Sequence, residues 1–215
     1  MPFVACSPCL ANTQITATYV QCLRDHRDAQ VRLETAIGVI DIDLYGTRAP
    51  LSVCNLLRYV AAGAFDRGTF FRTVRPDNEQ DKPVKIDVIQ ADVRQSVAPG
   101  SGQGAAAQFL PIPMERTVKT GLHHVDGAIS MARDGPDDAT ASFFICIGTQ
   151  PDLDFGGKRN PDGQGFAAFG RVRGGMDVVK QIWMAPADGE TLTPPIVIVR
   201  ATILRRQRLG RAIAR

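Results

Sequence analysis

Apolar and polar residues alternate along the first regular part of this 215-residue chain. Val31 and Leu33 are separated by a charged residue, and beyond a turn near Gly38 the apolar residues of segment 40–44 again occupy every second position. A period of two places successive side chains on opposite faces of a β-strand. The pattern therefore predicts a half-buried β-hairpin, whose apolar face must be covered by further sheet or by helices.

The rest of the chain is divided by turns and contains only two helical patterns. Its 20 Gly and 14 Pro residues exceed the average usage, roughly 12% for the two together, as is typical of short strands joined by turns. Further strands are predicted at 69–74, 86–89, 128–132, 143–147, 166–172 and 196–204. Amphipathic helices are predicted at 50–63 and from Met176 to about Met184. Because strands and helices do not alternate, the predicted fold class is mainly β, a closed antiparallel β-barrel capped by two α-helices.

The length of the chain fits one domain. We expect residues 1–30 to form a poorly ordered N-terminal extension, residues 31–204 to form the domain and residues 205–215 to form a basic C-terminal tail. The polar loop 75–85 is expected to be exposed. No apolar run approaches the roughly 18 residues that would span a bilayer, so we expect no membrane-spanning segment.

The positive charge is concentrated in the tail. Segment 205–215 carries five arginines and no acid, and removing these five charges from the formal net charge of +3 leaves −2. The domain therefore shows no excess of positive charge for binding nucleic acid. The tail is expected to be solvated and frayed, with weak contact to anionic surfaces as the alternative.

Five cysteines are present, an odd number without the spacing of a disulfide framework. Cys6 and Cys9 have a spacing used in zinc and redox sites, but no second pair follows and no strand–helix unit surrounds them. Metal or redox chemistry at this pair is therefore only an alternative. Cys146 lies in an apolar run and is expected to be a small core residue.

Several classes of catalysis are excluded by missing motifs. The only histidines are His26, His123 and His124, and no H-E-x-x-H, G-x-S-x-G or G-x-x-x-x-G-K-[ST] motif occurs. The sequence therefore does not support a zinc peptidase, a serine hydrolase with a G-x-S-x-G nucleophile elbow or a P-loop enzyme. Asp41 and Asp43 could pass for a catalytic carboxylate pair, but the alternation places both on the solvent face of one strand.

Three separated segments resemble one family. They are T-F-F-R-T-V at 69–74, D-G-A-I-S-M-A-R at 126–133 with S-F-F-I at 142–145, and G-F-A-A-F-G at 165–170. In order and spacing the chain is similar to the cyclophilin-type peptidyl-prolyl cis-trans isomerases, especially bacterial members, over residues 31–204. The resemblance implies an eight-stranded antiparallel β-barrel with a helix at each end, and isomerisation of X-Pro bonds with no cofactor and no metal.

Such a reaction makes few chemical demands on a site. Rotation about an X-Pro bond has a barrier of about 18–20 kcal/mol, because the amide nitrogen shares its lone pair with the carbonyl. No covalent bond has to break. An apolar pocket for the proline ring and a cationic donor for the prolyl nitrogen in the twisted state are sufficient.

The resemblance assigns the catalytic role to Arg72, with a surface strand charge as the alternative. It implies that substrate is bound by Phe71, Val88, Gln90, Ala132, Arg133, Asp134, Ser142, Phe144, Leu153 and Phe166. Within this set Phe144 is the pocket phenylalanine, Gln90 positions the substrate carbonyl and the arginine, and 132–134 is a strand edge for the bound peptide. A plain core role for Phe144 and an exposed strand amide for Gln90 remain alternatives. Alternation along the strand predicts that Phe70 and Arg72 share one face and that Phe71 lies on the other.

The chain departs from the family pattern at several positions. Val88 stands where methionine is usual, Phe71 where many members have histidine, Phe166 where eukaryotic members have histidine, and Ser142 where most have glutamine. Serine is too short to replace that glutamine fully, and one neutral hydrogen bond contributes about 0.5–1.5 kcal/mol, so turnover should be lowered without being abolished. The tryptophan of the loop wall is missing near Asp152, which predicts weak binding of cyclosporin-type ligands.

The function predicted is therefore isomerisation of X-Pro bonds in peptides and folding proteins. The alternatives are a catalytically weak proline-peptide-binding or chaperone module and a barrel with a purely structural role. The expected partners are proline-containing segments of client proteins, with no nucleic acid and no membrane, and we expect a monomer. No export signal is legible in residues 1–30, which favours the cytoplasm, with the periplasm as the alternative.

Overall fold

The computed structural model describes residues 19–25, 27–79, 82–94 and 109–204. Its elements, in chain order, are β1 (Ala29–Thr35), β2 (Gly38–Leu44), α2 (Pro50–Ala61), β3 (Thr69–Val74), β4 (Val88–Asp92), α3 (Thr117–Thr120), β5 (Ala128–Met131), β6 (Phe143–Cys146), the 3-10 helix η2 (Pro151–Leu153), β7 (Ala167–Gly174), α4 (Met176–Trp183), β8 (Ala187–Asp188) and β9 (Thr191–Leu204). A short helical segment also occupies residues 19–25.

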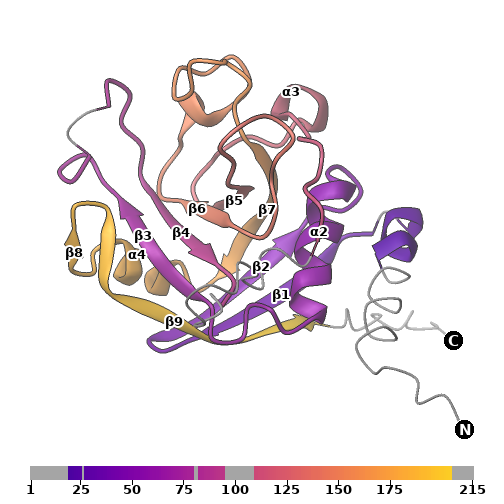
Figure 1. Ribbon diagram of the computed structural model, residues 1–215, viewed down its shortest axis with the longest axis horizontal. Coiled ribbons are helices and arrows are strands. Elements are labelled where there is room, and N and C mark those ends of the chain that lie inside the picture. Colours follow the sequence, from indigo (N-terminus) through magenta and orange to yellow (C-terminus); the bar gives the residue numbers. More distant parts are fainter. Residues whose placement is uncertain (1–18, 26, 80–81, 95–108, 205–215) are drawn as a thin grey trace, which may run out of the picture.

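Eight strands close into a barrel in the order β1-β2-β7-β5-β6-β4-β3-β9, and β9 pairs back with β1 to complete the ring (Figure 1). All neighbours are antiparallel, and β8 pairs only with the start of β9, as a hairpin outside the ring. The alternating residues of β1 and β2 face inward as predicted, with Val31 and Ile40 fully buried. The predicted barrel is confirmed, and with it the fold class.

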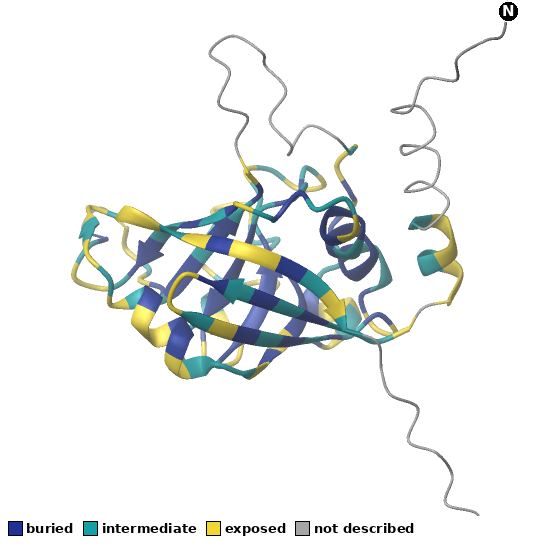
Figure 2. Ribbon diagram, turned by 90° about the horizontal axis from the view of Figure 1, so that it is seen from below, coloured by how far each residue is buried: buried dark blue, intermediate teal, exposed yellow. Residues whose placement is uncertain are grey.

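Aromatic rings fill part of the barrel interior. Phe143 meets Phe65 at 5.5 Å and Phe70 at 6.2 Å between ring centroids, both edge to face. Such contacts add to the free energy gained by burying the rings themselves. Figure 2 shows how the buried residues alternate with exposed ones along the strands of the wall.

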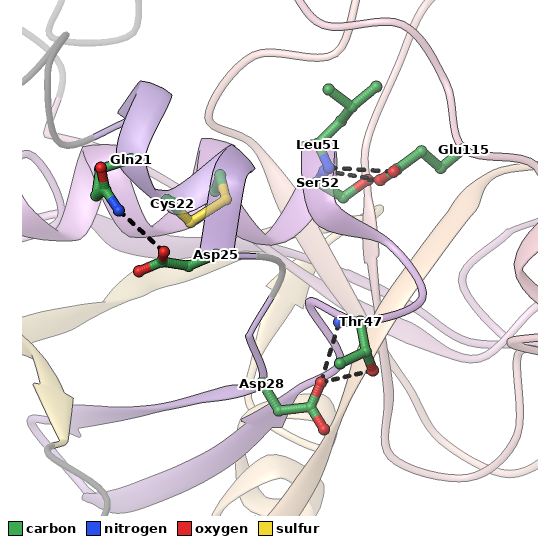
Figure 3. Close-up of a disulfide and its surroundings, with 9 residues drawn as sticks. Gln21, Cys22, Asp25, Asp28, Thr47, Leu51, Ser52 and Glu115 are labelled. Atoms are coloured by element: carbon green, nitrogen blue, oxygen red, sulfur yellow. Dashed lines mark hydrogen bonds between the residues drawn. A yellow bond between two sulfur atoms is a disulfide. The ribbon is translucent and has the colours of Figure 1, made fainter.

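The two long helices cover the barrel where the sequence predicted them. Pro50 occupies the first turn of α2, and its start is capped from a distant loop, since the carboxylate of Glu115 accepts from the backbone N–H groups of Leu51 at 3.0 Å and Ser52 at 2.8 Å (Figure 3). These are N–H groups that the helix itself cannot pair. Helix α4 buries Val179 and Ile182.

A disulfide joins Cys22, in the helical segment 19–25, to Cys54 in α2, with 5.8 Å between the Cα atoms (Figure 3). Next to it the guanidinium of Arg58 lies 4.5 Å from the centre of the Tyr19 ring. The sequence did not predict this pairing, because 32 residues and a hairpin separate the two cysteines. Cys146 is free, and it is buried as predicted.

Element boundaries differ from the predictions in a few places. Strand β4 begins at Val88, two residues after the predicted start, and β9 begins at Thr191 instead of residue 196. The short elements α3 and β8 were not predicted. The prediction that loop 75–85 is exposed is wrong at Glu79, whose residue is only 2% exposed because its carboxylate pairs with Arg159.

Within the parts of the chain that the structure describes, no helix has the length and apolar character needed to cross a membrane. The Cys6–Cys9 pair, the Gly-rich segment 99–107 and the tail 205–215 lie outside the described residues.

Candidate active site

A cavity of about 590 Å³ lies against the outer surface of the barrel, beside strands β3, β4 and β6. A small apolar cluster separate from the barrel core forms its base, and includes Val88, Phe144 and Leu153. All eleven site residues predicted from the sequence line this one cavity: Phe71, Arg72, Val88, Gln90, Ala132, Arg133, Asp134, Ser142, Phe144, Leu153 and Phe166. The structure therefore brings together residues from six separate segments of the chain.

Phe71 and Arg72 both line the cavity, although they are neighbours in one strand. The predicted alternation, with Arg72 on the same face as Phe70, is wrong: Phe70 is fully buried in the barrel core. The reason is a β-bulge, since the register shifts between Phe70 and Arg72 against both β4 and β9, and Phe71 is paired in neither ladder. An extra residue in one strand re-aims the side chains that follow it.

The guanidinium of Arg72 is held through a chain of hydrogen bonds across the cavity wall. Its Nη1 donates to Oε1 of Gln90 at 2.9 Å, and Nε2 of Gln90 donates to Oγ of Ser142 at 3.0 Å. The hydroxyl of Ser142 in turn donates to the carbonyl of Ala91 at 3.1 Å. Each group fixes the orientation of the next, so that the amide of Gln90 presents its oxygen to the arginine.

A carboxylate also contacts Arg72, which the sequence did not predict. Oε2 of Glu190, in the turn between β8 and β9, accepts from Nε at 2.6 Å and lies 2.5 Å from Nη2. No local pattern indicated this contact, because 118 residues separate the partners. The only local signal was the sequence Asp188-Gly189, which is typical of a tight hairpin turn.

The ring of Phe144 contacts two other rings. His124 stacks on one side at 5.9 Å with an interplanar angle of 15°, and Phe166 meets Phe144 edge to face at 5.3 Å. Phe144 belongs to the cavity cluster and not to the barrel core, so the alternative of a plain core role does not describe its position. The ring is held in one orientation as an apolar surface of the cavity.

His124 belongs to a polar network behind this ring. Its Nδ1 lies 2.6 Å from Oδ1 of Asp154, and its Nε2 lies 2.9 Å from Oγ of Ser130. Burial alone would raise the pKa of Asp154, but hydrogen bonds to His124 and His123 hold that pKa below its ordinary value. Although the order of groups is that of a hydrolase triad, Ser130 is fully buried and cannot reach a substrate.

Arg133 ties the strand edge at 132–134 to the loop 150–164. Its guanidinium donates to the carbonyl of Gly165 at 2.8 Å, pairs with Asp162 at 2.8 Å and lies 5.1 Å from the centre of the Phe166 ring. Hydrogen bonding to Arg133 lowers the pKa of the Asp162 carboxyl. The side chain of Arg133 is only 3% exposed, so its role is to hold the cavity wall in place. Pairing of a bound peptide with the backbone at 132–134 stays a prediction.

The described residues of loop 75–85 and the loop 150–164 line one side of the cavity and are connected to each other. The buried carboxylate of Glu79 pairs with the guanidinium of Arg159, which also donates to the carbonyl of Val84 at 2.7 Å. Eight lining residues were not predicted: Lys82, Ile86, Asp92, Asp138, Thr140, Arg159, Asn160 and Pro161. Most of them lie in loops, whose course over the barrel no periodicity reveals. Burial raises the pKa of Asp92, at the end of β4.

Among the described residues no group of three or more His, Cys, Asp or Glu side chains could hold a metal ion. The polar groups that line the cavity are donors and acceptors of hydrogen bonds, and they include the guanidinium groups of Arg72, Arg133 and Arg159. The arrangement can grip an apolar ring and donate to a neutral acceptor.

A closed eight-stranded antiparallel barrel, with a helix at each end and a cavity with an apolar base on its outer wall, defines the class of cyclophilin-like proteins. Comparisons with known proteins agree. A model of the family described as cyclophilin type peptidyl-prolyl cis-trans isomerase/CLD matches residues 30–203. The chain therefore belongs to the cyclophilin family and is a peptidyl-prolyl cis-trans isomerase.

Curated relatives include bacterial enzymes. The peptidyl-prolyl cis-trans isomerase cyp18 of Streptomyces antibioticus is 31% identical over 180 residues, which cover 81% of this chain and 98% of that protein. Peptidyl-prolyl cis-trans isomerase A of Dickeya dadantii is 31% identical over 182 residues, covering 82% of this chain and 85% of that protein. These relatives support the predicted resemblance to bacterial members.

Among solved structures, a cyclophilin type peptidyl-prolyl cis-trans isomerase of Cryptosporidium parvum matches with a TM-score of 0.64 and 19% identity, over 84% of this chain and all of that one. A second structure of the same protein, determined in the presence of the dipeptide Ala-Pro, gives a TM-score of 0.63. At this level of identity the likeness concerns the fold.

Proposed function

We propose that Arg72 is the catalytic residue of this isomerase and that the cavity on the outer barrel wall binds the X-Pro segment. The observation that supports the proposal is the position of Arg72 at this cavity. Gln90 orients its guanidinium, and Phe144 lines the same cavity. The alternative role of Arg72, a solvated strand charge, does not require any of these contacts.

The mechanism is non-covalent. When the X-Pro bond twists, the prolyl nitrogen loses conjugation, becomes pyramidal and regains a lone pair that can accept a hydrogen bond. The planar cis and trans states offer no such acceptor. A guanidinium N–H aimed at this nitrogen therefore stabilises the twisted state more than either planar state, which is the condition for a lower barrier.

The apolar residues at the base of the cavity suit the proline ring. Phe144, Val88 and Leu153 are at most 5% exposed and form one cluster there. Burying the proline ring among these residues would provide binding free energy without any polar contact to the ring. The strand edge at 132–134 would pair with the extended peptide on either side of the proline. The partners proposed are proline-containing segments of peptides and of folding proteins.

Ser142 bears on the rate. Its hydroxyl proton is donated to the carbonyl of Ala91, so the hydroxyl does not also donate to a substrate. This contact supports the prediction that turnover is lowered without being abolished.

The test is an isomerisation assay on a short proline peptide, with the parent, Arg72→Ala and a matched control, Arg200→Ala. Arg200 is an exposed arginine of β9 that does not line the cavity. We expect Arg72→Ala to lose roughly a hundredfold or more in kcat/KM, by analogy with the removal of other donors that stabilise a transition state. Arg200→Ala should match the parent. Equal rates for the parent and Arg72→Ala would refute the proposed role.

A catalytically weak proline-peptide-binding module is the second candidate, and the altered residue Ser142 is the observation that favours it. It predicts measurable affinity for proline peptides with turnover close to the uncatalysed rate. Robust turnover by the parent protein would dismiss it.

A further inference from the structure

We propose that Glu190 is a positioning residue for the isomerase reaction and acts by fixing the guanidinium of Arg72 at the cavity. The inference rests on the proposed function, because it matters for catalysis only if Arg72 is catalytic. Glu190 does not line the cavity and so acts through the arginine.

Glu190 and Gln90 hold different edges of the same guanidinium. Oε2 of Glu190 contacts Nε and Nη2, at 2.6 and 2.5 Å, whereas Oε1 of Gln90 accepts from Nη1 at 2.9 Å. A guanidinium is a rigid planar fork with five N–H donors, so contacts at two edges fix both its position and its plane. The remaining N–H groups of Nη1 and Nη2 are left to meet a substrate.

Gln90 alone would not fix the group. One contact at Nη1 leaves the guanidinium free to turn about that bond, and the side chain of Arg72 is 32% exposed, so the rest of the protein confines it only in part. Catalysis by a donor depends on its aim, and a displacement of about 1 Å can cost as much as roughly a hundredfold in rate.

The carboxylate is carried by a turn that is itself anchored. The backbone N–H of Thr73 donates to the carbonyl of Glu190 at 2.9 Å, and the side-chain amide of Asn78 donates to the carbonyl of Gly189 at 3.0 Å. Gly189 has φ of +56°, which a tight two-residue turn allows at glycine without strain. The turn therefore places Glu190 independently of the arginine.

A carboxylate next to the guanidinium also offsets part of the positive charge that a substrate would meet. This effect opposes catalysis. However, both side chains are about one-third exposed, and water screens charge over such an open site, whereas it does not replace the geometry of two fixed contacts. We therefore expect the positioning effect to exceed the charge effect.

The experiment compares Glu190→Ala and Glu190→Gln with the parent. The control is Asp188→Ala, which removes an exposed carboxylate from the same hairpin. Catalysed cis-trans exchange of an Ala-Pro peptide is measured by NMR exchange spectroscopy, and peptide affinity is measured by titration in the same samples. The Nε–H resonance of Arg72 reports the contact directly, and it should shift on loss of Glu190.

We expect Glu190→Ala to slow catalysed exchange by about threefold to thirtyfold, with peptide affinity changed by less than about twofold. Glu190→Gln should recover most of the rate, because its amide oxygen can accept from the same Nε–H. Asp188→Ala should match the parent. The split between rate and affinity is the result that a merely structural role of Glu190 would not produce.

Three results would overturn the inference. They are a rate for Glu190→Ala equal to or above that of the parent, a folded Glu190→Gln as slow as Glu190→Ala, and an Arg72 Nε–H in the parent that shows no sign of a hydrogen bond. The last measurement needs no variant and so decides the matter even if Glu190→Ala does not fold. If Arg72→Ala itself is fully active, the proposed function fails instead, and the two failures are thereby distinguished.

Discussion

Arg72 depends on residues from three distant parts of the chain. Gln90 comes from β4, Glu190 from the turn before β9, and Ser142, which orients Gln90, from the start of β6. Among these partners, the resemblance to the family indicated Gln90 and Ser142, because both match positions of the family's site. They gave no sign of Glu190, because its contact with Arg72 depends on how the β8–β9 hairpin folds back on β3.

Ser142 should support catalysis through Gln90. In Ser142→Ala, the amide of Gln90 loses the acceptor at 3.0 Å that sets its orientation, and its oxygen no longer faces Arg72 in a fixed way. The lost contact is one neutral hydrogen bond of about 0.5–1.5 kcal/mol, so kcat/KM should fall by roughly twofold to tenfold. The peptide isomerisation assay measures this. An unchanged rate, with the thermal unfolding midpoint preserved, would show that Gln90 needs no such support.

Other residues of the cavity were predictable only in part. The resemblance identified Phe144 and Phe166, and the structure adds that the His124 ring stacks on Phe144. The two-residue period failed at Phe71 because it assumes an uninterrupted ladder, and a bulge inserts one unpaired residue there. A bulge depends on pairing with two neighbouring strands, which a single segment of sequence does not contain.

At the scale of elements, the described part of loop 75–85 and the loop 150–164 form one wall of the cavity. Glu79 and Arg159 connect them through an ion pair whose side chains are 1% and 8% exposed. A charge taken out of water needs its partner, since the cost of leaving it unpaired is several kcal/mol. The polar composition of this segment predicted an exposed loop. The buried ion pair could not be predicted, because 80 residues separate its two partners in the sequence.

Removal of one partner should therefore be costly. We expect Glu79→Ala to lower the free energy of unfolding by about 3 kcal/mol, because the Arg159 guanidinium then stays buried without its counter-ion. The double variant Glu79→Ala, Arg159→Met should recover part of this loss, since it removes the orphaned charge as well. Urea unfolding of the three proteins measures both effects. A loss in Glu79→Ala below about 0.5 kcal/mol would place the pair in the range of exposed ion pairs.

For the whole molecule, alternation along β1 and β2, the two helical patterns and the turn spacing were enough to predict a closed barrel. These features are local, and the periodicity of apolar residues indicates which face of each strand or helix is buried. The disulfide was not predictable in this way, because nothing in the sequence shows that segment 19–25 lies against α2.

The disulfide should contribute to stability and not to catalysis. It closes a separation of 32 residues, for which constraint of the unfolded chain predicts roughly 3–4 kcal/mol. Cys22→Ser, Cys54→Ser should therefore lower the thermal midpoint, whereas kcat/KM should stay within about twofold of the parent, because neither cysteine lines the cavity. Calorimetry with and without a reductant, beside the peptide assay, tests both statements. An unchanged midpoint on reduction would mean that the bond does not form in solution.

The compartment remains a prediction. The sequence favoured the cytoplasm, with the periplasm as the alternative, whereas the Cys22–Cys54 bond favours an oxidising compartment such as the periplasm, since cytosolic thiols are kept reduced. Fractionation of cells, with the thiols of the chain alkylated at lysis, distinguishes the two.

The pairing of β1 with β9, which closes the barrel, brings the first and last strands of the domain together. Gln30 pairs with Leu204 there, so the chain enters and leaves the domain at neighbouring points. No residue of β1 or β9 lines the cavity. A second module inserted next to Gln30 or next to Leu204 would therefore join the domain at a part of the surface that does not line the cavity, and the same place suits attachment of the enzyme to a solid support.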